Sequence, residues 1–168
     1  MKKKNKAIYL LFLMPFVYFA TACFVVWLVK TSGIYPSGSD TMYHVYRGDY
    51  VYNAIKSGNW YPLYDPAWYN GVEILRYWSP FPAYVMAFCQ YLAGGSQFGA
   101  YLIYIGGVCF LGACVWPFIG RGFNRPYLGA FIGLLWFFMP NNLCAIFIEG
   151  NLARSLSMIS VSYTHLRA

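Results

Sequence analysis

Residues 7–29 read AIYLLFLMPFVYFATACFVVWLV, a stretch of 23 residues that contains no charged side chain. As a helix it would be ~34 Å long, enough to cross the ~30 Å hydrocarbon core of a bilayer with some tilt. The whole chain agrees with this segment, since 60% of its 168 residues are hydrophobic, 10% are charged and the mean hydropathy is +0.45. Soluble domains carry roughly 25% charged residues. The sequence therefore predicts an integral membrane protein.

The flanks of this stretch predict its orientation. Residues 1–6, MKKKNK, hold four of the twelve basic residues, and the positive-inside rule places such a segment in the cytoplasm. A cleaved signal peptide is the alternative, because ATAC at residues 20–23 resembles a lipoprotein cleavage box. However, FVVWLV follows at once where a mature lipoprotein should turn polar, and the apolar run exceeds a typical signal-peptide core. We interpret residues 7–29 as a retained first transmembrane helix.

Two further uncharged runs, residues 98–119 and 128–148, predict a second and a third transmembrane helix. A shorter apolar segment, residues 80–93, is too short to span comfortably. If it did span, the arginines of the connection 120–127 would face outward and break the positive-inside rule. We therefore expect 120–127 in the cytoplasm and an interfacial or re-entrant helix near 80–93.

This topology predicts an all-α, polytopic transmembrane helical bundle with a long extracytoplasmic loop at residues 30–96. A second extracytoplasmic loop would begin at residues 149–160. The first part of the long loop, residues 30–79, holds nine tyrosines and three tryptophans. Such residues form aromatic belts at membrane surfaces, but aromatic faces also stack on sugar rings. The candidate sugar- or lipid-binding side chains are Trp60, Trp68 and Trp78.

Charge and cysteine content exclude other classes of protein. The net charge of +7 comes from the basic N-terminus and scattered residues, with no basic stripe long enough to follow a phosphate backbone. We expect no nucleic-acid partner. The five cysteines form no CxxC pair and no His/Cys cluster with zinc-ligand spacing, which is typical of small buried side chains.

The stretch SGSDTMYHVYRGDY, residues 37–50, carries the clearest site candidate. On a helix beginning near residue 39, Asp40, His44 and Arg47 would share one face within about 40°. An acid or imidazole beside a guanidinium could take a proton from a hydroxyl while the arginine binds a phosphate. The structural alternative is a helix start at Asp40, an i,i+4 polar pair with His44, and an arginine that reaches lipid headgroups.

A second candidate pair, Glu149 and Arg154, follows the third apolar run directly. An acid at the edge of the hydrocarbon is costly and is a functional candidate by default, whereas an arginine there also serves as a helix-end anchor. A divalent metal is a weak expectation, since Asp40 and His44 supply only two ligands and Asp65, Glu73 or Glu149 would have to complete the set.

Three segments in this order carry a resemblance to a known family. They are SDTMYH at 39–44, GNWYPLYDPAWYNGVEILRYWSPFPAY at 58–84 and EGNLAR at 149–154. They resemble the bacterial membrane proteins called 6-pyruvoyl-tetrahydropterin synthase-related, which in turn are similar to GT-C-type glycosyltransferases that use polyprenyl-phosphate sugars. The resemblance covers residues 1 to about 160 and is strongest over 39–82.

The resemblance implies a bacterial inner-membrane enzyme that uses a polyprenyl-phosphate sugar at the outer face. It implies Asp40 as general base or metal ligand and Glu149 as a second acid, with His44 and Arg47 as supports or phosphate contacts. The Asp-x-Asp motif of some GT-C enzymes is absent. A non-catalytic membrane scaffold, sensor or transporter subunit whose aromatic loop binds lipid or glycan is the alternative.

The end of the chain departs from the resemblance. GT-C enzymes have many more membrane helices than the three predicted for this chain. Residues 161–168, VSYTHLRA, resemble translated adapter sequence from metagenomic gene fragments. The sequence therefore predicts a non-native tail and an N-terminal fragment of a longer protein.

Overall fold

The computed structural model describes residues 2–68 and 70–164, and the side chains of residues 12–68 and 70–160. Within that part of the chain it is all-helical, and its one β-type contact is an isolated bridge between Asp65 and Val72. The predicted all-α class is confirmed. The helices are α1 (Lys2–Ser32), α2 (Thr41–Lys56), α3 (Phe81–Leu92), α4 (Gln97–Gly122), α5 (Pro126–Leu135), the 3₁₀ turn η1 (Trp136–Phe138), α6 (Pro140–Leu143), the π turn η2 (Cys144–Ile148) and α7 (Leu152–Thr164).

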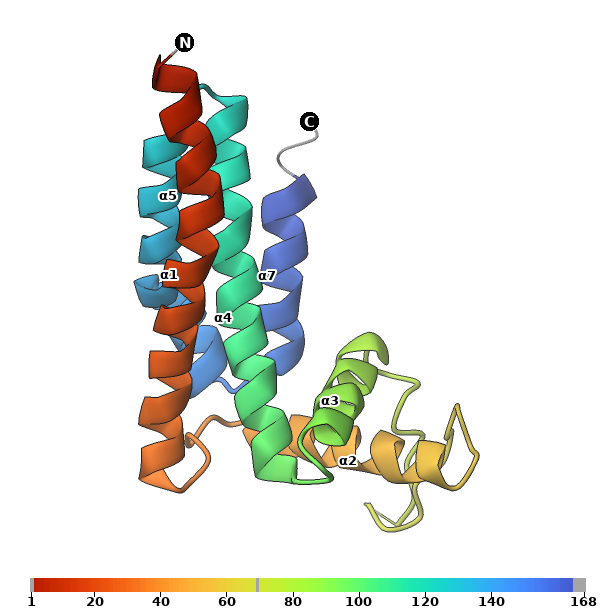
Figure 1. Cartoon of the computed structure of the whole chain (residues 1–168). Helices are drawn as coiled ribbons and strands as arrows, with labels where there is room; N and C mark the ends of the chain where they lie inside the picture. Colours follow the sequence, from red (N-terminus) through yellow and green to blue (C-terminus); the bar gives the residue numbers. More distant parts are fainter. Residues whose placement is uncertain (1, 69, 165–168) are drawn as a thin grey trace.

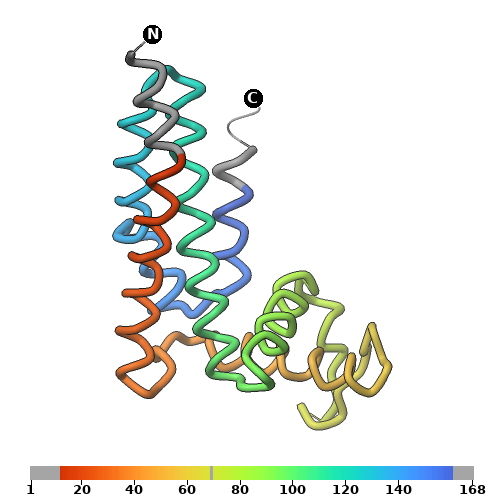
Figure 2. The backbone as a smooth tube through the Cα atoms, viewed as in Figure 1, coloured from red at the N-terminus to blue at the C-terminus, as the bar shows by residue number. Residues whose placement is uncertain are grey.

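The long helices form a bundle, and α2 and α3 extend sideways from one end of it (Figure 1). The coloured trace of Figure 2 follows α1 toward the end of the bundle that carries α2, and α7 leads away from that end. Among the described residues, three helical segments are long and apolar enough to cross a membrane: Phe12–Ser32, Gln97–Gly122 and Pro126–Ile148. They coincide with the three apolar runs of the sequence. The structure is thus that of a polytopic membrane protein with a polar–aromatic extension at one end.

Two tyrosine hydroxyls tie the bundle together across long stretches of chain. The buried Tyr18 of α1 donates to the carbonyl of Ala130 in α5 at 2.9 Å, and Tyr104 of α4 donates to the carbonyl of Leu152 in α7 at 2.8 Å. A buried phenol without an acceptor is costly, and at these two positions the carbonyls of neighbouring helices supply one.

The contact between α4 and α5 depends on glycine. A Cβ atom on Gly129 would lie 2.8 Å from the Cα of Gly120 and would also overlap the carbonyl oxygen of Trp116. By contrast, a Cβ on Gly107 of α4 would meet no atom within 4 Å. Small residues let membrane helices approach closely, and Gly129 is a position where that approach leaves no room for a methyl group.

We therefore expect Gly129→Ala to lower the free energy of unfolding in detergent by about 1–3 kcal/mol, because backbone atoms must move apart. Gly107→Ala is the matched control, a helical glycine in open space, and should be neutral or stabilising by up to about 1 kcal/mol through helix propensity. Equal stabilities of the two variants would show that α4 and α5 do not meet at Gly129.

The third span is broken near its middle. Met139 adopts an extended conformation (φ −60°, ψ 124°) directly before Pro140, because a residue that precedes proline is disfavoured in the helical region. The amide of the buried Asn142 donates to the carbonyl of Trp136 at 2.8 Å, which satisfies a backbone oxygen near the break. One transmembrane helix was expected over 128–148. The observed helical segment has the expected length, but it is not one continuous α-helix.

Helix α3 packs on α2 and α4 beside the bundle. It has 12 residues and is not one of the three candidate spans of the described chain. The side chain of its buried Gln90 donates to Asp49 of α2 at 2.6 Å and to the carbonyl of Gly95 at 3.1 Å. A helix is thus present near 80–93, and its expected interfacial or re-entrant relation to the membrane stays a prediction.

The structure differs from expectation after Ile148. Residues 149–160 were expected to begin an outer loop, but Leu152–Thr164 form α7, which runs back along α4 toward the end that holds the N-terminus (Figure 1). The buried Leu152 and Ser155 lie three positions apart on α7, which is the spacing of one helix face. Of the expected non-native tail, residues 161–164 belong to α7 and 165–168 lie outside the described residues, so its origin stays a prediction.

Candidate functional site

The structure places the predicted row at the start of α2, with His44 and Arg47 buried and Asp40 half-buried. Helix α2 begins at Thr41, with Asp40 at the N-cap position. Thr41, His44 and Arg47 follow at three-residue spacing and are 0%, 4% and 1% exposed. We call Asp40, Thr41, His44 and Arg47 the α2 cluster. A capping role for Asp40 is not what its side chain performs here, since its carboxylate makes no cap hydrogen bond.

The buried members of the α2 cluster lack partners. Within the described residues, no hydrogen bond reaches Thr41 Oγ1, His44 Nε2, or Nε and Nη2 of Arg47. A buried polar group without a partner costs roughly 1–3 kcal/mol, and an unpaired buried charge costs more. His44 and Arg47 share one helix face, and the guanidinium N–H donors on it match the chemistry of an anion.

Aromatic side chains form one wall of this cluster. The guanidinium carbon of Arg47 lies 5.4 Å from the ring centroid of Tyr43 and 6.0 Å from that of Trp78. Trp78 also meets Tyr43 at 5.8 Å and His44 at 6.0 Å between centroids, while Trp68 meets Tyr43 at 5.0 Å. Cation–π contacts of this kind offset part of the desolvation of the arginine, but they leave its N–H groups unused.

The three tryptophan candidates therefore separate. The loop between α2 and α3 brings Trp78 to His44 and Arg47 of the α2 cluster and brings Trp68 to the neighbouring Tyr43. The side chain of Trp60, by contrast, is 71% exposed. The backbone carbonyl of Trp60 accepts a hydrogen bond from Tyr84 of α3 at 2.6 Å. Trp60 thus contributes its backbone to the fold of the loop and presents its ring outward.

Burial controls the charge state of the cluster. Desolvation lowers the pKa of His44 to about 4, with the positive charge of Arg47 acting in the same direction and Asp40 opposing both. Desolvation also lowers the pKa of Arg47, and Tyr43 opposes it. His44 is therefore neutral at pH 7, and Arg47 supplies the positive charge.

This pKa predicts how stability depends on pH. The pKa of His44 is about 4 in the folded chain and 6.5 in the reference state, so between these values the unfolded chain binds a proton that the folded chain does not. Lowering the pH from 6.5 to 4 should reduce the free energy of unfolding by about 3 kcal/mol more in the native chain than in His44→Gln. Denaturant unfolding of both proteins in detergent measures the difference, and parallel pH profiles would contradict the burial of His44.

The second candidate pair is engaged in an ion pair. Nη1 of Arg154 donates to both carboxylate oxygens of Glu149, at 2.7 and 2.6 Å, and its Nη2 donates to Oδ1 of Asn141 at 2.8 Å. Asn141 lies in α6, at the break in the third span. The pair therefore joins the start of α7 to the broken helix, and it is partly open to solvent.

The backbone brings the two predicted acids together. The N–H of Asp40 donates to the carbonyl of Glu149 at 2.9 Å, and the hydroxyl of Ser39 donates to the same oxygen at 3.0 Å. The two acids are far apart in the sequence, but the start of α2 lies against the turn before α7. Their side chains have different surroundings, since that of Glu149 is paired with Arg154 and that of Asp40 lies on the α2 cluster.

One residue of this region, Thr41, was missed in the sequence analysis, and another, Asp65, was given a different role there. Thr41 was not singled out, although its spacing to His44 and Arg47 could have revealed it. Asp65, considered only as a metal ligand, is buried and accepts hydrogen bonds from the Tyr46 hydroxyl and, at 2.9 Å, from the N–H of Ala67. The bond to Asp65 raises the pKa of Tyr46 to about 12. Because Tyr46 lies on α2 and Asp65 lies in the loop that follows it, this hydrogen bond joins the loop to α2.

A metal ion does not fit the described side chains. Across residues 2–68 and 70–164, no group of three or more His, Cys, Asp or Glu side chains is placed to hold one. The positive charge of Arg47 acts on His44, and the Glu149 carboxylate pairs with Arg154. The donor set at the start of α2 suits an anion better than a cation.

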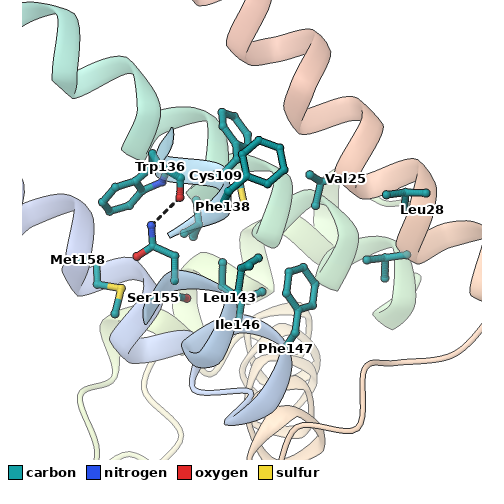
Figure 3. Close-up of a pocket in the computed structure, with 14 residues that line it drawn as sticks. Val25, Leu28, Cys109, Trp136, Phe138, Leu143, Ile146, Phe147, Ser155 and Met158 are labelled. Carbon is teal, nitrogen blue, oxygen red and sulfur yellow. Dashed lines mark hydrogen bonds between the residues drawn. The ribbon is translucent and has the colours of Figure 1, made fainter. Parts of the chain in front are cut away.

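A cavity of about 200 Å³ lies apart from the α2 cluster, among α1, α4, the broken third span and α7. Its walls are almost wholly apolar. Figure 3 shows Val25 and Leu28 of α1 on one side and Met158 of α7 on the other, with the hydrogen bond from Asn142 to the Trp136 carbonyl between them. No residue of α2 lines it. The cavity is a feature of the membrane part and not of the polar site.

Comparison with known proteins identifies the family. Residues 75–166 match the model of the 6-pyruvoyl-tetrahydropterin synthase related domain, described as a membrane protein. The match includes Trp78, Glu149 and Arg154, and it reaches into the tail that was expected to be non-native. No curated protein and no solved structure matches the chain. Because the match covers more than half of its length, the chain belongs to the membrane protein family defined by the 6-pyruvoyl-tetrahydropterin synthase related domain.

Proposed function

We propose that the chain forms the N-terminal part of a GT-C-like glycosyltransferase that uses a polyprenyl-phosphate sugar. The observation that carries the proposal is the buried guanidinium of Arg47, whose Nε and Nη2 have no hydrogen-bond partner in the described chain, on the same helix face as Asp40. A phosphate at this place would accept hydrogen bonds from the free N–H groups of Arg47 and pair with its charge. His44 and Thr41 offer further polar contacts on the same face.

The proposed step is the transfer of a sugar to a hydroxyl. The carboxylate of Asp40 accepts the proton of the acceptor hydroxyl while the oxygen of that hydroxyl forms a bond to the anomeric carbon of the sugar. The bond from that carbon to the phosphate oxygen breaks, and polyprenyl phosphate leaves with the bonding electrons. Arg47 neutralises the charge that develops on the leaving group. Trp78 provides an aromatic face beside His44 and Arg47, Trp68 provides one beside Tyr43, and Trp60 provides an exposed one.

The ion pair of Glu149 and Arg154 adds a second charged position near the start of α2. Its carboxylate is available as a second acid only if Arg154 releases it, and Arg154 is then free to contact phosphate. In this proposal both residues take part in substrate binding, and Asp40 acts as the base.

The proposal includes an orientation. With the basic N-terminus in the cytoplasm of a bacterial cell, α2 and α3 lie at the outer face of the inner membrane, because they occupy the opposite end of the bundle (Figure 1). A polyprenyl chain then lies in the bilayer while its phosphate reaches the α2 cluster at the surface. Membrane lipid is the surrounding partner.

The experiment that tests this function uses the full chain expressed from its complete locus and reconstituted in proteoliposomes. A polyprenyl-phosphate hexose, labelled in the sugar, is added with a hydroxyl-bearing acceptor lipid. The proposal predicts protein-dependent release of polyprenyl phosphate together with label in the acceptor. Label that stays with the donor at every protein concentration would contradict it.

One observation favours a second function. Large apolar side chains stand exposed along the outer extension, among them Trp60, Tyr61, Tyr77 and Phe81. Such a rim fits lipid headgroups or a glycan, as a non-catalytic scaffold, sensor or transporter subunit would require. This function predicts lipid or glycan binding without transfer in the same proteoliposomes.

A further inference from the structure

We infer that the turn at Glu149 and Gly150, which is distant in the sequence, positions the α2 cluster by fixing the backbone of Asp40 and Thr41. That this matters for catalysis rests on the proposed function. The positioning itself rests on contacts of the described residues. It makes Gly150 a positioning residue, which acts through Asp40 and Thr41 and not on a substrate.

The first observation is a pair of hydrogen bonds on one carbonyl. The oxygen of Glu149 accepts from the N–H of Asp40 at 2.9 Å and from the hydroxyl of Ser39 at 3.0 Å. The N–H groups at the start of a helix have no partner within it. At α2 the Glu149 carbonyl supplies a partner for the residue that carries the candidate base.

The second observation is the absence of space around Gly150. Its φ of +66° is in the left-handed region, and a Cβ atom there would lie 2.6 Å from the backbone nitrogen of Thr41 and overlap the Thr41 hydroxyl. From the other side of the contact, a Cβ on Gly38 would lie 2.6 Å from the backbone nitrogen of Gly150. Two backbones meet here with glycine on each side, so the contact tolerates no side chain.

The third observation is the anchor behind the turn. The Glu149 carboxylate is bound by Arg154 of α7, which also contacts Asn141 at the break of the third span. The backbone N–H of Arg154 donates to Oδ1 of Asn151 at 2.9 Å. The start of α7 lies beside the start of α2 (Figure 1). A shift of α7 or of the broken helix is therefore transmitted to Asp40 through this turn.

Hydrogen exchange of the full chain in nanodiscs tests the inference without any ligand. Gly150→Ala should speed the exchange of the amides in residues 38–44 by about 10-fold or more, because the lost contact frees the start of α2. Gly33→Ala is the matched control, since Gly33 has nearly the same φ of +69° but no atom within 4 Å of a new Cβ. Exchange in residues 100–110 of α4 reports whether the bundle is intact.

The outcomes are distinct. Faster exchange at 38–44 in Gly150→Ala, with Gly33→Ala and α4 unchanged, supports the inference. Unchanged exchange at 38–44, or equal acceleration in both glycine variants, overturns it, since backbone strain alone would then explain the effect. If Gly150→Ala does not insert, Arg154→Met replaces it, with Arg76→Met as the control, because Arg76 also forms an exposed pair with a glutamate, Glu73.

A folded-state titration separates positioning from general stability. Selective histidine NMR should show the pKa of His44 rising from about 4 toward its ordinary value in Gly150→Ala or Arg154→Met, as water reaches the loosened cluster. A loss of global stability alone leaves that pKa unchanged and overturns the inference. An inactive wild-type protein in the transfer assay would overturn the proposed function alone, since neither exchange nor titration needs a substrate.

Discussion

Replacing Arg47 by methionine should make the ligand-free protein more stable, by about 1–4 kcal/mol in the free energy of unfolding. Arg47 is 1% exposed, and Nε and Nη2 reach no hydrogen-bond partner in the described chain. Its contacts are the faces of Tyr43 and Trp78, which methionine also contacts well because its side chain is flexible and polarizable. The substitution therefore removes an unpaired buried charge and keeps most of the packing.

Denaturant unfolding in detergent, without phosphate in the buffer, measures this gain. Arg76→Met is the control, because the Arg76 side chain is exposed and its ion pair with Glu73 should contribute little. Arg47→Lys should not reproduce the gain, since it keeps the charge. A clear loss of stability in Arg47→Met would contradict the account, because it would make Arg47 a structural residue whose interactions are satisfied within the fold.

Replacing Asp40 by asparagine should lower the rate of sugar transfer by about 10²–10⁴-fold, the usual contribution of a general base. Asp40 stands at the N-cap position, yet its carboxylate makes no capping hydrogen bond. Its backbone N–H, which asparagine retains, carries the contact with Glu149. The fold should therefore survive the substitution while the base is lost.

Transfer by the full chain in proteoliposomes measures the effect of Asp40→Asn. Asp49→Asn is the matched control on the same helix, since Asp49 accepts a hydrogen bond from Gln90 and asparagine keeps an acceptor oxygen there. We expect Asp49→Asn to insert and transfer nearly as the native protein does. A fully active Asp40→Asn protein would remove Asp40 from the chemistry and favour the scaffold, sensor or transporter function.

The membrane helices could be predicted from the sequence because lipid leaves the backbone few choices. In a bilayer every N–H and C=O must be paired internally, so an uncharged run of sufficient length becomes a helix. Residues 7–29 and 98–119 follow this rule directly. The third run follows it only in length, since Pro140 breaks the helix and Asn142 repairs one of the exposed carbonyls. The partner of Asn142 depends on packing that no local pattern reports.

The position of the α2 cluster could be predicted from the sequence, but its burial could not. Helical spacing places Asp40, His44 and Arg47 on one face, but it does not reveal whether that face meets water or protein. The burial of Arg47 comes from residues distant in sequence, such as Trp78. Likewise, Glu149 and Arg154 are five residues apart and would not pair along a regular helix. The positive φ of Gly150 turns the chain between them.

The central claim is that the α2 cluster binds a phosphate, and one comparison of affinities tests it most directly. The full chain in nanodiscs is titrated with a polyprenyl phosphate and with the polyprenol of the same length, with tryptophan fluorescence as the signal. The account predicts that the phosphate binds about 10-fold or more tightly than the alcohol, and that Arg47→Met abolishes this difference. Equal affinities of the native protein for the two lipids would contradict it.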